Sequence, residues 1–525
     1  MLDNIKKTNL LLNRIYKKKL SYLFLLTIFN VLVEFVTLSL LASFIIVLND
    51  PEVINQKINS EFILSYLNSL SFEKLIIYFA TILFFAVILK NIINLGTTYF
   101  ELSLKKKLVI YNFEKLYSAF LKSDYLYIVN KNPSELVNKL QNIIPKAVDT
   151  IFFYFLIFKE SLITIFLLSL IFLTDTTIFL FLLAIFGIII FLFFKNFRKK
   201  LDYYSKLKIL NENKILQIIL ETANNFKIIK LLNKNEFFKN NLIKNIDLAN
   251  SITMFKNFLD KVPKAFFEIS LVTVLVTLFV FLIYQDLDFK SFVPTIVLLC
   301  ISFLRLLPSF SNITAIRNSI NFHRHDVLKF LEEIDNINDN DKTVKLLNFS
   351  DDIDSIELKN INFKYNDKSK FSLKNINIHL SKNNIYCFVG KSGSGKSTLV
   401  DIVTGLIDNV QGKININNKD VSMKGYDWKS KVSYVPQNIY LTDNSIIENI
   451  TIGEDVNSIN KQKFNDALNF AELTEFINTL HQKEHTKVGD AGKQISGGQK
   501  QRIGIARAIY KENNILIFDE ATNAL

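Results

Sequence analysis

The pattern of apolar residues divides the chain into a first part with long apolar runs and a second part with short ones. In the first part, six runs approach or exceed the roughly 20 residues that a helix needs to cross a bilayer. They lie at residues 21–48, 75–98, 151–173, 177–196, 265–285 and 291–313. The pattern predicts an all-α transmembrane domain of six helices over residues 1–315, followed by a linker over residues 316–350.

From residue 351 the apolar runs become short and alternate with polar residues. This alternation predicts strands at Ser355–Leu358, Ile361–Lys364 and Leu373–Ile378. A helical pattern covers Lys500–Tyr510. We therefore expect a separate α/β domain over residues 351–525.

Basic residues are concentrated in residues 1–20, 101–150 and 195–264, whereas residues 174–177 contain none and residues 285–290 contain one. The positive-inside rule then predicts a multi-pass protein of the cell (inner) membrane with both termini and the two long loops in the cytoplasm. Polar and apolar residues alternate with helical periodicity in the two long loops. We therefore expect the helices to continue beyond the membrane, with a break at Asn132–Ser134. These extensions are suited to contact a cytosolic domain.

Composition supports the membrane assignment and argues against a cysteine-based metal or disulfide scaffold and against a nucleic-acid-binding protein. Half of the residues are hydrophobic and 48 are Phe, while Cys300 and Cys387 have neither metal-site nor disulfide spacing. The net charge of +13 could indicate a nucleic-acid partner. Because the lysines follow the predicted topology and no base-stacking platform is visible, we expect no nucleic-acid partner.

The segment Gly390–Thr398 reads GKSGSGKST and follows the apolar run Ile385–Val389, which predicts a strand. It leads into Leu399–Val403, which predicts a helix. Strand, glycine loop and helix form the setting of a P-loop, whose backbone N–H groups surround the phosphates of a bound nucleotide. We predict ATP as the cofactor, bound by Gly390, Ser392, Gly393, Gly395, Lys396, Ser397 and Thr398. Ser397 is also a predicted ligand of Mg²⁺.

Two further strand ends carry polar residues suited to phosphate chemistry. Ile515–Phe518 reads as a buried strand ending in Asp519 and Glu520, which predicts a Mg²⁺ ligand followed by a residue that polarises the attacking water. Val432–Pro436 ends at Gln437. Tyr365 could stack on an adenine ring, although a lone tyrosine at a strand end ordinarily serves packing.

Together these motifs resemble the ATP-binding cassette transporters of the exporter type, with fused membrane and nucleotide domains. Ile495–Arg502 (ISGGQKQR) is similar to the family signature, and Val488–Gly492 resembles the stretch before it. The resemblance implies roles for Tyr365 in adenine stacking, for Gln437 at the Mg²⁺ and the reacting water, and for Asp519 and Glu520. It also implies a homodimer in which each ATP is held between one P-loop and the partner's Ser496, Gly497, Gly498 and Gln499.

Ionisable residues inside the predicted spans are candidates for a transport path. We place Lys90 and Glu268 at the membrane interface and expect Glu34 and Arg305 to line a cavity or to pair with each other; Lys159 and Glu160 are further candidates. Glu34, Asn49–Pro51 and Arg305–Ser309 resemble the subgroup that contains lipid-linked oligosaccharide flippases. The resemblance implies ATP-driven movement of an amphipathic lipid or lipid-linked glycan, with a peptide or drug exporter as the alternative.

The sequence stops at Leu525, inside the stretch that the family continues as its D-loop. The aspartate of that loop and the later switch histidine are absent, and the five histidines all precede Asp519. We expect the sequence to be incomplete. The alternative is a hydrolysis-defective ATP-binding membrane protein.

Overall fold

The computed structural model divides the chain into two units by its internal contacts. The first unit is Met1–Lys122 with Lys131–Asp341, and the second is Ser123–Asn130 with Lys342–Leu525. Apart from isolated positions, the residues that the structure describes are 11–49, 71–129, 132–174, 203–284, 289–340, 347–348, 352–365, 372–408, 410–421, 426–489 and 492–519.

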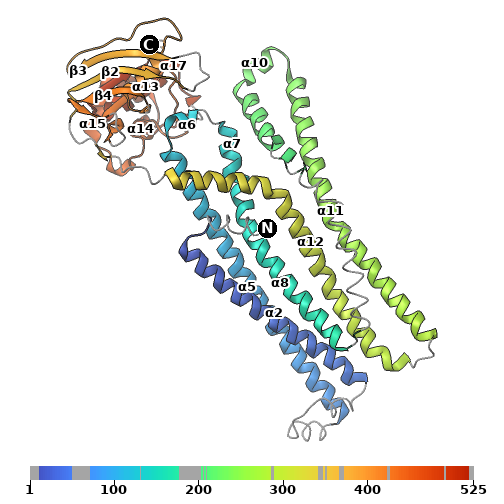
Figure 1. Ribbon diagram of the computed structural model, residues 1–525. Helices are drawn as coiled ribbons and strands as arrows, with labels where there is room; N and C mark the ends of the chain where they lie inside the picture. Colours follow the sequence, from blue (N-terminus) through green and yellow to red (C-terminus); the bar gives the residue numbers. More distant parts are fainter. Residues whose placement is uncertain are drawn as a thin grey trace. The chain divides into compact units, whose positions relative to one another are not determined.

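Long helices build the first unit (Figure 1). They are α2 (Arg14–Asn49), α5 (Phe72–Lys122), α8 (Ile144–Thr174), α11 (Asn235–Tyr284) and α12 (Phe289–Asn340). These helices contain five of the six predicted spans, and the fourth, 177–196, lies outside the described residues. Within the described part of the chain, Arg14–Ile45, Phe72–Lys122 and Pro133–Ser169 are long and apolar enough to cross a membrane.

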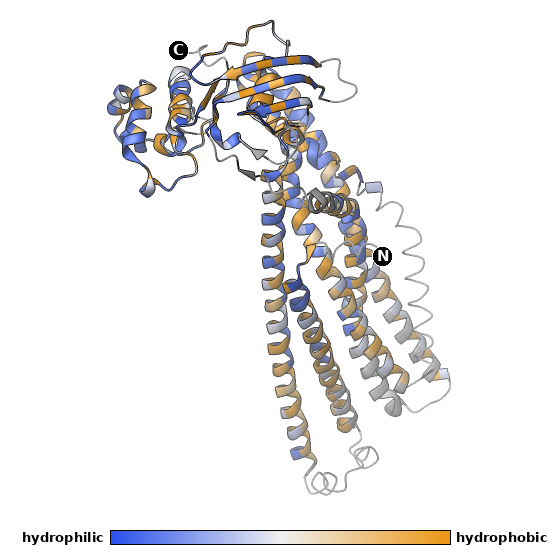
Figure 2. Ribbon diagram, turned by 60° about the vertical axis from the view of Figure 1, so that its left-hand side comes forward, coloured by the Kyte–Doolittle hydropathy of each residue, from blue (hydrophilic) through white to orange (hydrophobic). Residues whose placement is uncertain are grey.

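The helices are longer than a bilayer requires. With 51 residues at a rise of about 1.5 Å per residue, α5 extends for roughly 75 Å, whereas a hydrocarbon core is about 30 Å thick. Its outward side chains include Phe84, Phe85 and Leu95, which are 63%, 67% and 70% exposed. Apolar residues cover long stretches of these helices in Figure 2, as a lipid-facing surface requires.

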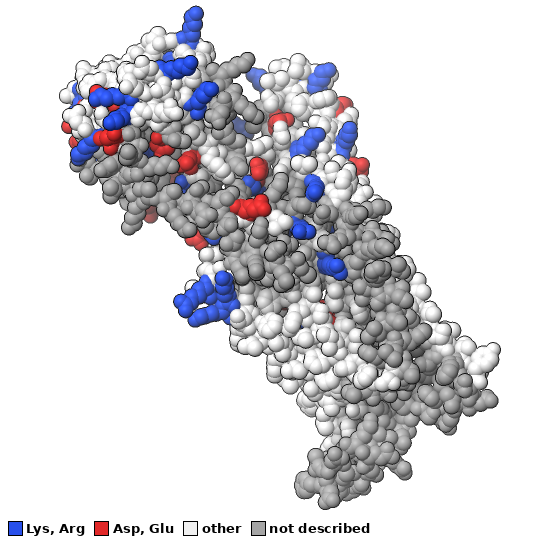
Figure 3. All heavy atoms as spheres, viewed as in Figure 1, with Lys and Arg blue, Asp and Glu red and all other residues white. Residues whose placement is uncertain are grey.

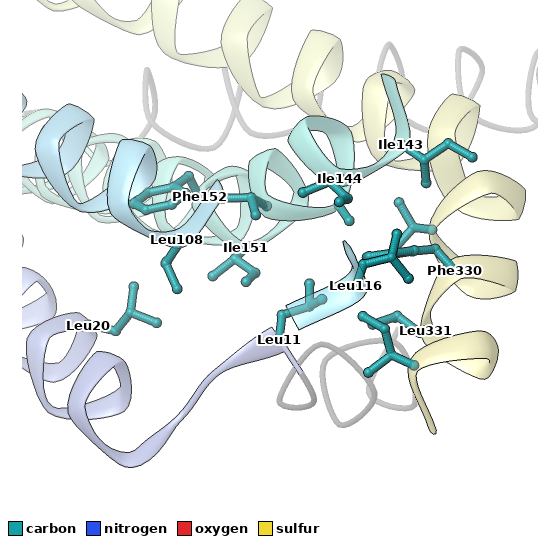
Figure 4. Close-up of a cluster of buried hydrophobic side chains, with 14 of the residues drawn as sticks. Leu11, Leu20, Leu108, Leu116, Ile143, Ile144, Ile151, Phe152, Phe330 and Leu331 are labelled. Atoms are coloured by element: carbon teal, nitrogen blue, oxygen red, sulfur yellow. The ribbon is translucent and has the colours of Figure 1, made fainter. Parts of the chain in front are cut away.

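Two separate apolar clusters hold the first unit together. Figure 4 shows the first, where Leu11 and Leu20 meet Leu108 of α5, Ile144 of α8 and Phe330 of α12. The second lies further along the helices and contains Val31, Ile163, Leu167, Ile171, Phe267, Phe303, Leu306 and Phe310. Side-chain packing therefore fixes the rotation of α2, α8 and α12 at two levels, while α5 contributes to the first cluster and α11 to the second.

The predicted break in the first long loop is confirmed. The Asn132 side chain accepts hydrogen bonds from the Ser134 backbone nitrogen at 3.0 Å and from its hydroxyl at 2.7 Å. It thereby caps α7 (Pro133–Asn138), which has Pro133 in its first turn and leads through η2 (Lys139–Ile143) into α8. The second loop contains the short helix α10 (Phe226–Leu231).

In the second unit, an antiparallel sheet has the order β3-β2-β4-β5. Its strands are β2 (Ser355–Phe363), β3 (Leu373–Ser381), β4 (Gln411–Ile416) and β5 (Lys419–Asp420). The two strands predicted before residue 365 form the single strand β2. Its pairing shifts near Asn360, whose φ is 53°.

Two parallel strand pairs complete the described strands. They are β7 (Val432–Val435) with β8 (Ile515–Phe518), and β1 (Leu347–Asn348) with β6 (Tyr426–Asp427). The helices of the unit are α6 (Tyr125–Val129), α13 (Lys396–Val403), α14 (Ile446–Ile450), α15 (Lys461–Phe470), α16 (Thr474–Thr479) and α17 (Gly497–Tyr510), with the short turns η3 (Lys429–Lys431), η4 (Val456–Ser458) and η5 (Lys483–His485). The helical domain and the following α/β domain predicted from the sequence are therefore the observed fold class, with five of the six predicted helices among the described residues.

One predicted strand is wrong. Residues 385–389 adopt no regular structure, and Ile385 and Val389 are almost fully exposed. A buried parallel strand needs hydrogen-bonded neighbours and covered faces. No described residue pairs with this segment as a strand, so the run of apolar residues alone does not make one.

Candidate functional site

The P-loop owes its shape to glycines in the left-handed region. Gly393 and Gly395 have φ values of 78° and 99°, which residues with a Cβ adopt only at a cost. Gly395 is the N-cap of α13, so the first backbone N–H groups of that helix lie in the loop. An anion placed there meets free donors and the positive end of the helix.

The Lys396 side chain folds back over this loop. Its ammonium nitrogen donates to the carbonyl oxygens of Gly390 at 2.8 Å and Lys391 at 3.3 Å. Backbone carbonyls therefore hold a full positive charge beside the helix start, while Ser392 and Ser397 are exposed.

Tyr365 lies beside the P-loop helix. Its hydroxyl is 2.9 Å from the hydroxyl of Thr398, which is buried, and its ring packs edge-on against Phe363. The residue is 42% exposed. Tyr365 is thus anchored at its tip and remains partly accessible next to the loop.

Gln437 and Asp519 follow two neighbouring strands at the same edge. Val435 of β7 is in register with Phe518 of β8, and the Asp519 backbone nitrogen donates to the Val435 carbonyl at 3.0 Å. Ligand-binding residues commonly lie at such carboxyl ends of parallel strands.

Two residues that the sequence analysis did not single out surround Asp519. The Tyr434 hydroxyl donates to Asp519 Oδ2 at 3.0 Å, and burial together with this bond raises the pKa of Tyr434 well above its ordinary value. Burial and the nearby Asp519 carboxylate also raise the pKa of Asp401 on α13. The P-loop helix and the end of β8 therefore lie close enough for their carboxylates to interact.

The helix α6, from the first long loop, contributes Tyr125, a third residue near the P-loop helix that the sequence analysis did not single out. Leu126 packs against the apolar core that contains β2 and part of α13. Partial burial, Asp401 and Tyr365 raise the pKa of Tyr125. The loop that we expected to contact the nucleotide domain therefore packs near the P-loop helix. A tyrosine in a loop gives no sequence signal of this placement.

The signature begins a separate helix. Ser496 is the N-cap of α17, and its side chain and that of Gln499 bond reciprocally to each other's backbone N–H, at 3.3 and 3.0 Å. Ser496 and Gly497 are exposed, so the start of α17 is accessible. Glu520 and Asp490 lie outside the described residues.

In the first unit, charged and amide side chains surround a cavity of about 330 Å³. The lining comes from α2, α5, α8 and α12 and consists of Asn30, Glu34, Lys90, Asn91, Asn94, Lys159 and Arg305. Arg305 Nε donates to Glu34 Oε1 at 2.6 Å, so the pairing that we expected as one possibility is present.

Lys90, which we placed at the membrane interface, lies on the cavity wall, with its ammonium 3.9 Å from the Glu34 carboxylate. By contrast, Glu268 is paired with Lys264 at 3.6 Å, and both side chains are more than half exposed.

A chain that joins long apolar helices to a P-loop domain defines a membrane-bound nucleotide-binding protein. Residues 20–307 match the ABC transporter transmembrane region, and residues 373–523 match the ABC transporter ATP-binding family. The chain belongs to the ABC transporter family.

The relatives of the chain agree with this assignment. A putative export ATP-binding/permease protein of Rickettsia prowazekii is 39% identical over 34% of this chain and 31% of its own length. The alpha-hemolysin translocation ATP-binding protein of Escherichia coli O157:H7 is 39% identical over 32% of this chain and 24% of its own length. An ATP-dependent lipid A-core flippase of Pectobacterium atrosepticum is 36% identical over 32% and 29%. The chain thus spans less than a third of the length of each.

The fold as a whole is similar to that of a bacterial Atm1-family ABC exporter solved with ATP bound. The TM-score is 0.75 at 15% identity, covering 98% of this chain and 87% of that one. This likeness concerns the fold.

Proposed function

We propose that this protein is an exporter-type ABC half-transporter that uses ATP hydrolysis to move an amphipathic substrate, a lipid or lipid-linked glycan, out of the cytoplasmic leaflet. The observation that carries the proposal is the presence, in one chain, of a P-loop with its lysine in place and of a polar cavity between apolar helices. Neither a membrane anchor nor a soluble ATPase needs both features.

The nucleotide chemistry follows from the site residues. Lys396 and the N–H groups at the start of α13 bind the phosphates, and Tyr365 stacks on the adenine. Ser397, Asp519 and, through its amide, Gln437 are suited to Mg²⁺, which prefers oxygen ligands and binds through one or two carboxylates plus phosphates. The proximity of Asp401 to Asp519 fits a cation here, because it concentrates negative charge. When bound, the ion would neutralise charge on the phosphates, and Glu520 would polarise the attacking water.

A second copy of the chain completes each ATP site in this proposal. The accessible start of α17, with Ser496, Gly497 and Gly498, is suited to bind the γ-phosphate of ATP held by the partner. Exposed apolar side chains on α10, Phe226 at 57% and Leu231 at 77%, are suited to being covered by another subunit.

In this proposal both termini lie in the cytoplasm, and the protein is a multi-pass protein of the cell (inner) membrane. On the face seen in Figure 3, the described Lys and Arg side chains of the long helices that are visible lie in the upper part of the view, as the positive-inside assignment expects.

The lipid-linked glycan class rests on the resemblance of Glu34 and Arg305–Ser309 to the oligosaccharide flippases. The relatives named above include a lipid flippase and a hemolysin translocator, so a peptide or drug exporter is the competing candidate.

Transport by the reconstituted full-length protein tests the proposal. In sealed vesicles containing a fluorescent phospholipid, the quenchable outer-leaflet signal should change only when ATP and Mg²⁺ are supplied. Vesicles with Lys396→Ala should behave as vesicles without protein. Parallel vesicles with a labelled amphipathic peptide separate the two substrate classes. ATP-dependent movement of neither substrate, with turnover no greater than that of Lys396→Ala, would support the hydrolysis-defective alternative.

A further inference from the structure

The charges on the cavity wall do not balance. Lys90, Lys159 and Arg305 supply three positive charges, while Glu34 supplies one negative charge, which leaves an excess of two. Two more carboxylates lie nearby but outside the lining. Glu101 on α5 interacts electrostatically with Lys159, and Glu160 accepts hydrogen bonds from Ser309 at 2.6 Å and Asn312 at 3.1 Å.

This arrangement gives a nearly neutral cluster with a cationic inner surface. The outer carboxylates offset the cost of placing lysines among apolar helices. They leave the wall itself positive, because Glu160 is directed to α12 and Glu101 is not part of the lining.

The two lysines are held less tightly than the arginine. Arg305 is committed to Glu34 at 2.6 Å, whereas Lys90 is 3.9 Å from the same carboxylate, beyond ordinary hydrogen-bond length. Among the residues that the structure describes, the hydrogen-bond acceptor of Lys159 is a neutral amide oxygen, that of Asn94, at 3.3 Å. Both ammonium groups therefore gain most from a stronger acceptor.

We propose that this cavity binds the anionic group, a phosphate or carboxylate, of the transported molecule, and that Lys90 and Lys159 are its primary contacts. Arg305 and Glu34 form the fixed wall beside it. The proposal rests on the exporter function above and names the chemistry of its substrate.

The size of the cavity supports a headgroup. A volume of about 330 Å³ lies at the lower end of the roughly 300–1,000 Å³ typical of small-ligand pockets. It accommodates a polar group, whereas long acyl chains must lie along the apolar helix surfaces, such as those of α5.

Equilibrium binding tests the proposal without requiring transport. The probes are fluorescent phosphatidylglycerol and fluorescent phosphatidylcholine, added to the full-length protein in neutral detergent. We expect the parent protein to prefer phosphatidylglycerol, and Lys90→Gln and Lys159→Gln each to weaken that binding roughly tenfold while leaving phosphatidylcholine unaffected. Lys90→Arg and Lys159→Arg should retain most of the preference because they keep the charge.

Lys74→Gln is the matched control, since Lys74 is an exposed lysine at the start of the same helix α5. It removes an equal charge away from the cavity and should change nothing. Competition by inorganic phosphate and by glycerol phosphate distinguishes a free anion from a lipid headgroup. Displacement by either at millimolar concentration identifies a soluble phosphate site, and resistance identifies a site that needs the attached lipid.

Equal affinity of the parent for the two lipids overturns the proposal, as does a preference that survives the double substitution Lys90→Gln/Lys159→Gln. These results are independent of turnover. A protein that hydrolyses ATP but binds both lipids equally refutes the anion site alone, and one that binds phosphatidylglycerol selectively but never hydrolyses ATP refutes the exporter function alone.

Discussion

The nucleotide site and the membrane cavity both concentrate positive charge, but they hold it by different means. At the P-loop, a single lysine rests on backbone carbonyls, and glycines and a helix start supply the other donors. In the cavity, charge lies on side chains from four helices, and a buried carboxylate, Glu34, pairs with Arg305.

This difference determines whether a substitution at each site affects activity or stability. Backbone carbonyls return to solvent at little cost when Lys396 is removed, so the loop should keep its structure and lose its function. Removing Glu34 leaves cations without a partner among apolar helices, which is a cost to stability. Substitution of Lys396 should therefore lower activity without lowering stability, whereas substitution of Glu34 should lower stability.

The largest effect is expected for Glu520→Gln. Loss of a general base typically lowers turnover by about 10²–10⁴-fold, while the similar size of the amide should preserve ATP binding and trap a closed dimer. Steady-state ATP hydrolysis and size-exclusion chromatography with ATP measure the two parts. Unchanged turnover in the full-length protein would show that another residue polarises the water.

Lys396→Ala should lower hydrolysis by roughly 10²–10³-fold, because it removes the cation that faces the phosphates. Its thermal unfolding should match that of the parent. The control is Lys391→Ala. Lys391 is a neighbouring exposed lysine that contacts Lys396 through its backbone carbonyl, which the substitution keeps, so this variant should hydrolyse ATP normally. Equal ATP affinity in Lys396→Ala and the parent would disprove the phosphate-binding role.

The membrane pair should show the reverse pattern. Glu34→Ala and Arg305→Ala each leave a charge without its partner and should destabilise the protein by about 3 kcal/mol, with Glu34→Ala the more severe because it leaves both Arg305 and Lys90. The double variant should recover much of the loss. Thermal unfolding of the four proteins in one detergent forms the double-mutant cycle, and purely additive losses would show that the pair is not coupled.

The smallest effect is expected for Tyr434→Phe. The Tyr434 hydroxyl and Mg²⁺ compete for Asp519 Oδ2, so removal of the hydroxyl should lower the Mg²⁺ concentration needed for half-maximal hydrolysis by a few-fold. A Mg²⁺ titration of ATP turnover measures it. A higher requirement would mean that Tyr434 orients the carboxylate for the ion instead.

The two sites also differed in how far the sequence predicted them. Nine consecutive residues form the P-loop, so Lys396 and its glycines could be assigned from local spacing alone. The Tyr434–Asp519 contact joins residues 85 positions apart and depends on the register of β7 and β8. That register is set by the packing of the domain, so the contact was missed.

The cavity depends still more on tertiary structure. Glu34 and Arg305 are 271 residues apart, and their pairing was foreseen only as one of two alternatives. That Lys90 lines the same cavity was not foreseen, because a helix that is apolar on every side has no polar face to indicate its rotation. The strand expected at Ile385–Val389 failed for a related reason, since five apolar residues do not reveal whether other strands pair with them.

The central claim is that the cavity and the ATP site belong to one coupled machine, and reciprocal binding tests it most directly. Coupling requires that ATP change the affinity of the cavity for its anionic ligand by the same factor as the ligand changes the affinity for ATP, typically 5–150-fold. The measurement is the dissociation constant of fluorescent phosphatidylglycerol for full-length Glu520→Gln, with and without Mg²⁺ and ATP. The account predicts a shift of at least about fivefold that disappears in Lys90→Gln/Lys159→Gln. Identical constants with and without ATP, in a protein shown to bind ATP, would contradict it.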